Sequence, residues 1–314
     1  MKKITLAAIA VLILFSCRKN ETASIENEEQ HQRSCAADEV VNLQLQADPS
    51  LGLRMSQLES FTKKLIENGA VLRGGTIEIP VVVHVLYNTT EENISDAQIQ
   101  SQIDVLNEDF NLRNADRSQV PSIFTGVTAN VGVRFVLSQT IRKFSTKRSW
   151  AANDQMKFSQ NGGSDVVDPA HKLNIWVCDL QKYLGYAYYP GITPELDGVV
   201  VWYKAFGRTG ALQVPYHKGR TATHEVGHYL NLRHIWGDAA CGNDLVDDTP
   251  QHNTANFGCP SYPHLSTCAG SPVEMTMNYM DYTDDPCMFM FSNGQKTRML
   301  ALFAPGGPRA GLGQ

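Results

Sequence analysis

The segment from His224 to His234 constrains the fold of this chain more than any other. His224 and His228 are four residues apart, so a helix would place both imidazole rings on one face. His234 follows six residues after His228, where a continuous helix would turn its side chain about 120° away from that face. The chain must therefore leave the helix between these two histidines if all three rings are to meet. Asn231 lies where the break is needed, and asparagine tolerates the left-handed conformation better than most residues.

These histidines have the residue type and the spacing of a catalytic zinc site. Neutral imidazole is a good zinc ligand, and catalytic zinc typically keeps three protein ligands and one open position. Glu225 follows His224 directly, which turns it away from ligation and toward a water that it could deprotonate. The first five residues alone could arise by accident on an amphipathic helix, but His234 adds a third ligand at the required place. The sequence therefore predicts a zinc site at His224, His228 and His234, with Glu225 as general base.

The N-terminus has the composition of an export signal. Lys2 and Lys3 precede an apolar run, Ile4 to Phe15, which is too short to be a good membrane span. Cys17 follows this run, as the lipid-modified cysteine does in bacterial lipoprotein signals, so it is a candidate lipid anchor. We therefore expect residues 1–17 to be a signal peptide. The protein would be exported, either as a lipoprotein of the bacterial cell envelope or as a secreted protein.

The next segment, residues 18–73, is predicted to be a pro-segment. Its first part, to about residue 50, is polar, charged and poor in aromatic residues, so it cannot bury enough surface to fold alone. An amphipathic helix that ends at Gly69 follows, with apolar residues at Leu53, Met55, Leu58, Phe61 and Leu65. Arg73 is a candidate processing site. The catalytic domain is then expected to comprise residues 74–314.

Alternating elements in this second part predict an α/β domain around one twisted sheet. Ile77 to Tyr87 is rich in β-branched residues and predicts a strand. A candidate helix cap at Ser95 and Gln98 precedes a helix whose apolar face contains Ile99, Ile103, Leu106 and Phe110. Further strands are predicted at Val131 to Leu137, Leu173 to Leu180 and Val199 to Tyr203. After Gly237 the chain is rich in Cys, Pro, Asp and Asn, and no regular structure is expected.

Charge and cysteine content narrow the class of protein. The net charge of −5 gives no electrostatic case for binding nucleic acid. Export implies an oxidising compartment, in which cysteines can pair. Apart from Cys17 there are six cysteines, and six allow 15 connectivities, so counting alone does not pair them. The sequence does not indicate whether the chain is a monomer or an oligomer.

With the zinc segment, a later motif makes the chain resemble the pappalysin family of metzincin metallopeptidases. Residues 278–282, Asn-Tyr-Met-Asp-Tyr, resemble the family's Met-turn, and residues 294–299 resemble its closing helix. The resemblance covers about residues 76–305; it departs at Asn231, where the longer metzincin pattern has glycine. It implies a metzincin-like α/β (α+β) fold. In that fold a twisted, mostly parallel sheet with a backing helix and the zinc helix is followed by an irregular, disulfide-stapled C-terminal subdomain.

The resemblance also implies roles for single residues. Tyr282 would lie near the metal and stabilise the transition state. Met280 would pack beneath the zinc site and is not a ligand. Two disulfides are implied in the C-terminal subdomain, Cys241–Cys268 and Cys259–Cys287. Cys178, in a predicted strand, is then expected to be a buried free thiol.

Two more sites follow from the same resemblance. Cys35 resembles the cysteine switch, in which a pro-segment thiolate takes the open position of zinc. The family usually has glycine after this cysteine, where the present chain has Ala36. Asp244, Asp247 and Thr249 lie in the loop where the family carries structural calcium, and hard oxygen ligands at short spacing suit that ion. A solvated acidic turn explains the composition of this loop equally well.

These features together predict a secreted zinc endopeptidase that is made as a latent zymogen. Protein or peptide substrates would pair in extended form with an edge strand, for which Gly185 to Tyr189 is a candidate. The best-studied family members prefer arginine on the primed side, and Asp284 and Asp285 lie near the expected acidic pocket. One alternative is a surface-anchored adhesion lipoprotein on a metzincin-like fold with little turnover. Another is a zinc hydrolase that does not act on peptides.

Overall fold

The computed structural model describes residues 33–69 and 75–312. The predicted signal peptide, residues 1–17 with the candidate anchor Cys17, lies outside the described residues. The candidate processing site Arg73 also lies outside them. Among the described residues, no helix is both long enough and apolar enough to span a membrane.

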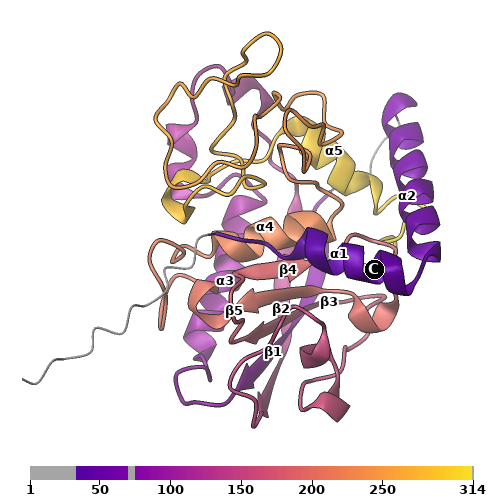
Figure 1. Cartoon of the computed structure of the whole chain (residues 1–314), viewed down its shortest axis with the longest axis vertical. Helices are drawn as coiled ribbons and strands as arrows, with labels where there is room; N and C mark the ends of the chain where they lie inside the picture. The colour runs from indigo at the N-terminus through magenta and orange to yellow at the C-terminus, as the bar shows by residue number, and fades with distance from the viewer. Residues whose placement is uncertain (1–32, 70–74, 313–314) are drawn as a thin grey trace, which may run out of the picture. The chain divides into compact units, whose positions relative to one another are not determined.

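A five-stranded sheet with the strand order β2-β1-β3-β5-β4 forms the centre of the described fold (Figure 1). Its strands are β1 (Ile77–Tyr87), β2 (Val133–Phe144), β3 (Leu173–Cys178), β4 (Gly185–Ala187) and β5 (Val199–Trp202). Neighbouring strands are parallel except β4, which runs antiparallel to β5 at one edge. β3 and β5 are buried along their whole lengths, as apolar runs predict for strands that are covered on both faces. The predicted α/β fold with a mostly parallel sheet is thus confirmed.

The opposite edge strand, β2, is longer than its sequence predicts. It continues to Phe144, well past the expected end at Leu137, and most of the added part is partly or fully exposed. An edge strand pairs on one side only, so it can carry polar side chains that the hydrophobic pattern does not mark as strand.

Two helices, α3 (Asp96–Asp109) and α4 (Arg220–Tyr229), pack against the sheet and against each other. Ser95 caps α3 by accepting a hydrogen bond from the backbone N–H of Gln98, as the sequence predicts. α4 carries the histidine motif; it is buried along its whole length and contacts β4 and β5. The motif is therefore held between the edge of the sheet and the C-terminal region (Figure 1).

The described part of the predicted pro-segment, residues 18–73, contains two helices, α1 (Ala37–Ala47) and α2 (Ser50–Glu67). α2 is the predicted amphipathic helix, and it packs against α5 (Asn293–Ala301). α1 was not expected, because its sequence is too polar to fold alone. Val40 and Val41 are buried in the main core, so packing against the catalytic domain, rather than helix propensity, orders this segment.

The C-terminal region between Gly237 and α5 is irregular, as predicted, with one short 3₁₀ turn assigned at Asp285–Cys287. Two disulfides cross-link it, Cys241–Cys268 and Cys259–Cys287, which are the pairings that the resemblance implies. They join residues 27 and 28 positions apart. Bridges over loops of that length stabilise a fold by about 3–4 kcal/mol each on the chain-entropy model, which offsets the scarcity of regular structure. Cys178 is buried and unpaired, and Cys35 is also a free thiol.

Candidate metal centre

The helix that carries the histidines ends where the sequence requires. Asn231 has a φ of 71°, in the left-handed region, and the backbone N–H of Leu232 donates to the Gly227 carbonyl oxygen at 2.9 Å. This closing pattern stops α4 and turns the chain back toward the helix face. The expected break between His228 and His234 is therefore present.

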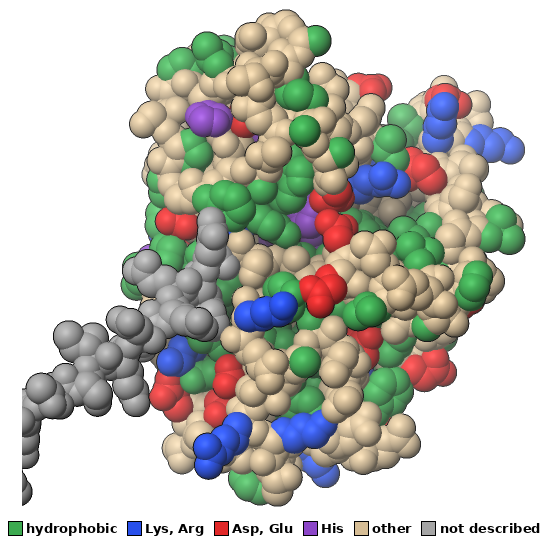
Figure 2. Space-filling model, in the orientation of Figure 1, with side chains coloured by type: hydrophobic (Ala, Val, Ile, Leu, Met, Phe, Trp, Pro, Cys, Tyr) green, Lys and Arg blue, Asp and Glu red, His purple; other side chains and the backbone are tan. Residues whose placement is uncertain are grey.

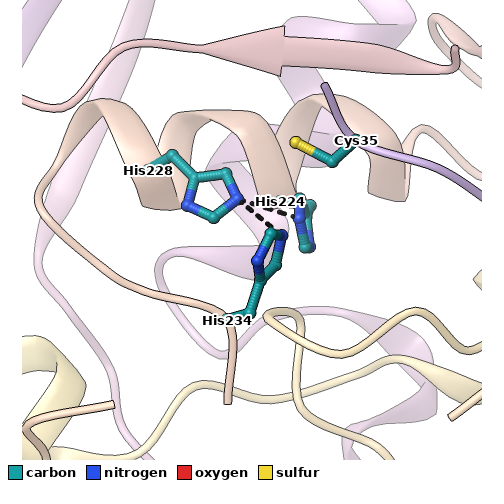
Figure 3. A group of neighbouring side chains, drawn as sticks. All are labelled: Cys35, His224, His228 and His234. Carbon is teal, nitrogen blue, oxygen red and sulfur yellow. Dashed lines mark hydrogen bonds between the residues drawn. The ribbon is translucent and has the colours of Figure 1, made fainter. Parts of the chain in front are cut away.

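All three histidines converge on one point (Figure 3). The Nε2 atom of His228 lies 3.1 Å from Nε2 of His224 and 3.1 Å from Nε2 of His234. The Cys35 sulfur is turned toward them from the pro-segment (Figure 3), and the four candidate ligand atoms all lie within 4.8 Å of one another. The rings are buried, with 1% exposure at most. Sequence spacing alone predicted this meeting of the histidines.

Hydrogen bonds at the far side of each ring fix which nitrogen faces the centre. Nδ1 of His224 lies 2.7 Å from the Tyr279 carbonyl oxygen, and Nδ1 of His228 lies 2.8 Å from the Leu232 carbonyl oxygen. Nδ1 of His234 lies 2.5 Å from the Asp238 carboxylate. Each acceptor requires a proton on Nδ1, so each Nε2 directs a lone pair into the centre. Three lone pairs this close repel one another unless a cation lies between them, and zinc fits that donor set.

The protonation of His224 and His228 agrees with this assignment, whereas His234 keeps a second proton until a metal ion displaces it. Burial, followed by the charges of His228 and His234, holds the pKa of His224 well below its ordinary value. Burial also lowers the pKa of His228 to about 3. Burial would lower the pKa of His234 as well, but the hydrogen bonds that it donates to the Asp238 and Asp38 carboxylates raise its pKa to about 9. A cation in the centre would take the place of that proton, since metal binding releases protons from its ligands.

Glu225 lies beside the three rings without joining them. Its side chain is buried, and burial raises its pKa to about 8. The Cys35 thiol donates to Glu225 Oε2 at 3.2 Å, so the carboxylate faces the place that the sulfur occupies. Gly185 in β4 permits this approach, because a Cβ atom there would lie 2.9 Å from Glu225 Oε1. A side chain at residue 185 would displace the carboxylate.

The Met-turn lies directly beneath α4. Met280 is fully buried, and its sulfur would lie 2.4 Å from a Cβ atom on Gly227, so a side chain at residue 227 would displace the methionine. The Met280 carbonyl oxygen accepts a hydrogen bond from the Ile235 N–H at 3.1 Å, which ties the turn to the His234 segment. Met280 is therefore a packing residue that supports the zinc segment from below.

Tyr282 stands at the rim of the centre. Its ring centroid lies 4.9 Å from that of His234 and 5.7 Å from that of His224. Its hydroxyl accepts a hydrogen bond from the Cys35 N–H at 3.2 Å and lies 3.3 Å from the Cys35 carbonyl oxygen. The hydroxyl thus faces the chain that crosses the centre.

Residues 34–36, in the predicted pro-segment, cross this centre in extended form beside β4 and pair with it through one isolated bridge. Cys35 forms a parallel bridge with Gly185, the Leu184 N–H donates to the Ser34 carbonyl oxygen at 3.0 Å, and the Ala36 N–H donates to the Gly185 carbonyl oxygen at 3.0 Å. The open edge of β4 is therefore occupied by the segment that carries the thiol.

Sequence reasoning did not identify the buried ion pair between Arg33 and Asp285. Arg33 is 3% exposed, and its guanidinium lies 5.2 Å from the centre of the Tyr216 ring. Asp285 is held by the backbone N–H groups of Lys218, at 2.7 Å, and Arg220, at 3.3 Å. Of the two aspartates near the expected acidic pocket, Asp285 is thus the one that binds Arg33.

The structure adds one residue to the predicted site and removes another from the predicted calcium ligands. Asp238, the partner of His234, was not identified, although a carboxylate four residues after a ligand histidine is a usable signal. In the candidate calcium loop, the Thr249 hydroxyl donates to the buried Asp244 carboxylate at 2.9 Å. Asp247 is exposed, so the structure brings together two of the three predicted calcium ligands.

Known proteins share this sequence and fold. The family profile described as "Pregnancy-associated plasma protein-A", of peptidase family M43, matches residues 160–304. "Extracellular metalloprotease 1" of Coccidioides posadasii is 35% identical and covers 72% of this chain and 77% of its own length. "Extracellular metalloprotease" of Arthroderma otae is 32% identical and covers 81% of this chain and 87% of its own length.

Two solved structures from Tannerella forsythia are similar over most of the chain. Mature mirolysin, in complex with a cleaved peptide, is 46% identical, with a TM-score of 0.73. The match covers 76% of this chain and 96% of that one. A promirolysin mutant is 41% identical, with a TM-score of 0.82 over 89% of this chain and 96% of that one. The expected metzincin-like fold is confirmed, and the chain belongs to the M43, or pappalysin, family and is a zinc metalloendopeptidase.

Proposed function

We propose that this protein is a secreted endopeptidase, made as a latent zymogen, in which His224, His228 and His234 hold the zinc ion. The observation that carries the proposal is the convergence of three buried imidazoles, with Nε2 of His228 lying 3.1 Å from Nε2 of each of the other two and each ring oriented by a hydrogen bond at Nδ1. When bound, zinc would polarise the scissile carbonyl and lower the pKa of a water.

The residues around the zinc ligands then have separate tasks. Glu225, whose carboxylate faces the place of the Cys35 sulfur, takes a proton from the attacking water and gives it to the leaving amine. The Tyr282 hydroxyl donates to the oxygen that becomes negative in the transition state. Its present contact with the Cys35 backbone supports this role, because that backbone crosses the centre where a substrate would lie.

Peptide substrates bind in extended form along β4. In the zymogen this edge pairs in parallel with the pro-segment at Cys35. Once the pro-segment leaves, the free N–H and C=O groups of the edge can pair with a substrate backbone. Mature mirolysin was solved with a cleaved peptide, which supports a peptide substrate for the present chain.

The pocket of Asp285 and Tyr216 selects the residue after the scissile bond. Asp285 offers a buried carboxylate and Tyr216 an aromatic ring, and both already contact the guanidinium of Arg33. An arginine side chain can donate a charge-assisted hydrogen bond to the Asp285 carboxylate and make a cation–π contact with the Tyr216 ring. We therefore expect cleavage before arginine.

Latency follows from the pro-segment, residues 18–73, which blocks the site at two points. Cys35 would take the open position of zinc, and Arg33 fills the specificity pocket. The match with promirolysin covers 89% of this chain, whereas that with mature mirolysin covers 76%, which supports a removable leader. The mature enzyme would begin near residue 74, after Arg73.

Export is supported by relatives that are named extracellular metalloproteases. We propose cleavage of residues 1–17 and secretion; a lipid anchor at Cys17 is the alternative. Replacing Cys17 with alanine separates the two, since an anchored protein would move from the membrane fraction to the medium and a secreted one would not change.

The direct test is mass-spectrometric profiling of a peptide library with the activated chain. We expect cleavage before arginine, its loss with a zinc chelator and its return when zinc is added. An adhesion protein would show no chelator-sensitive turnover. A zinc hydrolase of another class would cleave small amides and leave the peptides intact.

A further inference from the structure

Arg298 of α5 forms a second strong attachment between the catalytic domain and the pro-segment. Its guanidinium holds the Glu59 carboxylate through two hydrogen bonds, Nη1 to Oε1 at 2.8 Å and Nη2 to Oε2 at 2.6 Å. Its Nε donates to the Asn231 carbonyl oxygen at 3.2 Å. Arg298 is 2% exposed, so its charge lies buried beneath the carboxylate that pairs with it. The planar fork of arginine fits a carboxylate in this two-bond geometry, which makes the site selective for that group.

A cavity of about 160 Å³ lies beside this pair. Glu59 lines it from the pro-segment, and Asn231 and Arg233 line it from the catalytic domain. The side-chain Nδ2 of Asn231 is buried and has no hydrogen-bond partner in the described part of the chain. An unsatisfied buried donor is costly, so a carboxylate oxygen beside Asn231 would be stabilised.

The surrounding charges favour an anion at this place. Burial would raise the pKa of Glu59, but the hydrogen bonds and charge of Arg298, with smaller effects from Arg233 and Lys63, hold it below its ordinary value. Lys63 belongs to the pro-segment and leaves with it. Arg298 and Arg233 remain, and Arg233 is already exposed.

The cavity also adjoins the zinc centre. Tyr189 lines it, and its ring centroid lies 5.5 Å from that of His228. Asp238 lines it as well and hydrogen bonds to His234. Figure 2 shows acidic and basic side chains beside a hollow in which histidine is visible. A peptide bound at the zinc centre could therefore reach this place.

We propose that Arg298, Arg233 and Asn231 form a carboxylate-binding subsite, which Glu59 fills in the zymogen and an acidic side chain of the peptide substrate fills in the mature enzyme. This subsite rests on the proposed function, because it requires removal of the pro-segment. When α2 leaves, Arg298 loses the carboxylate that pairs with it, and its buried charge becomes available to the substrate.

The path of the pro-segment fixes the side of the zinc on which the subsite lies. Arg33 binds Asp285, Cys35 faces the histidines, and Glu59 lies beyond them in the cavity next to Asn231. A substrate whose arginine binds Asp285 just after the scissile bond must extend past the histidines in its N-terminal direction. The acidic residue therefore precedes the scissile bond.

Matched peptides test the subsite. Each has arginine after the scissile bond and one glutamate at a different position before it, and each has a twin with glutamine in place of that glutamate. The full-length chain, activated by an external protease, is assayed for the ratio of kcat/KM between twins. We expect glutamate to be favoured about tenfold at one position, as for a hydrogen-bonded charge pair. The preference should fall with added salt.

Two variants locate the effect. Arg298→Lys keeps the charge but loses the two-bond fork, and Arg233→Gln removes an exposed charge, so both should bring the ratio toward one. Arg134→Gln is the control, because Arg134 pairs with Glu78 on the opposite edge of the sheet. Each ratio is taken within one variant, so a loss of folded protein lowers both rates and does not mimic the result.

Equal rates for all twins would overturn the subsite. So would a glutamate preference that survives both Arg298→Lys and Arg233→Gln. If no peptide is cleaved, including the glutamine twins, the proposed peptidase function fails as well, which distinguishes the two failures.

Discussion

At the scale of one residue, Asn231 connects the three histidines with Arg298. Its left-handed backbone turns the chain so that His234 returns to the face of His224 and His228. Its carbonyl oxygen holds Arg298. Position 231 is where the metzincin pattern has glycine, so backbone conformation, rather than side-chain chemistry, is the main requirement there.

Substitutions at residue 231 should therefore follow backbone strain. Asn231→Ala should destabilise the fold by roughly 1–2 kcal/mol, because a Cβ atom without a local polar group disfavours the left-handed region. Asn231→Gly relieves that strain and should stay close to the wild-type stability. Thermal unfolding of both variants checks this, with the alanine variant lower by several degrees. A glycine variant as unstable as the alanine variant would contradict it.

Single residues could be predicted from sequence where the signal is local. The proposed zinc ligands lie within one short segment, and helix geometry together with the break at Asn231 brings their rings together. Asp285 could not be chosen over Asp284, because burial and the two backbone donors that hold it depend on residues far along the chain. Asp238 was missed for a different reason: its spacing of four residues from His234 is a usable local signal, but the motif that predicts the metal site does not extend to the partners of the ligands.

At the scale of elements, residues 34–36 are held by backbone hydrogen bonds to Leu184 and Gly185, and the preceding Arg33 is held by its ion pair with Asp285. The Tyr282 hydroxyl and the Cys35 backbone are 247 positions apart in sequence. Contacts between residues so far apart leave no local pattern in the sequence. The amphipathic helix α2 was therefore predicted, but α1 and the extended segment before it were not. The polar composition of that segment describes it correctly as a chain that does not fold alone.

Removing the thiol should weaken latency of the full chain. Cys35→Ala keeps the backbone bonds to β4 but loses the sulfur that faces the histidines, so self-activation should begin many times sooner. Ser34→Ala is the matched control, since its hydroxyl contacts the Lys182 carbonyl oxygen away from the centre. The lag before peptide hydrolysis is the measurement. Equal lags in Cys35→Ala and in the wild type would exclude a switch at this residue.

In the candidate calcium loop, the structure supports Asp244 and Thr249 as neighbouring ligands but leaves Asp247 exposed. Burial raises the pKa of Asp244 to about 7, because the hydrogen bonds from Thr249 and Val246 offset only part of its effect, and a bound cation would supply further compensation. If calcium supplies it, added calcium should raise the melting temperature of the full chain, by roughly 2–4 °C for each kcal/mol of stabilisation. Asp244→Asn should abolish the rise, and Asp247→Asn, at an exposed position, should keep it. No calcium response in the wild type would identify the loop as a solvated acidic turn.

At the scale of the whole molecule, the sequence predicted the class of fold and the order of its parts. Alternating strands and helices indicate the parallel sheet, and the Cys-rich composition after Gly237 indicates a cross-linked irregular region. The long-range ion pairs that attach the pro-segment could not be predicted. Arg33 and Asp285 are 252 positions apart, and Glu59 and Arg298 are 239 apart, so only the folded chain shows that they meet.

The most direct measurement compares zinc content and peptide turnover in the wild type and in Glu225→Gln. Both full-length proteins are activated by the same external protease. Glu108→Gln serves as the control, because Glu108 lies on α3 and pairs with Arg208. Because Glu225 is the proposed general base and not a ligand, we expect Glu225→Gln to keep about one zinc ion per chain and to lose at least about a hundredfold in kcat. Turnover at the wild-type rate by a zinc-loaded Glu225→Gln, or a wild type that hydrolyses peptides without zinc, would contradict the assignment of this centre.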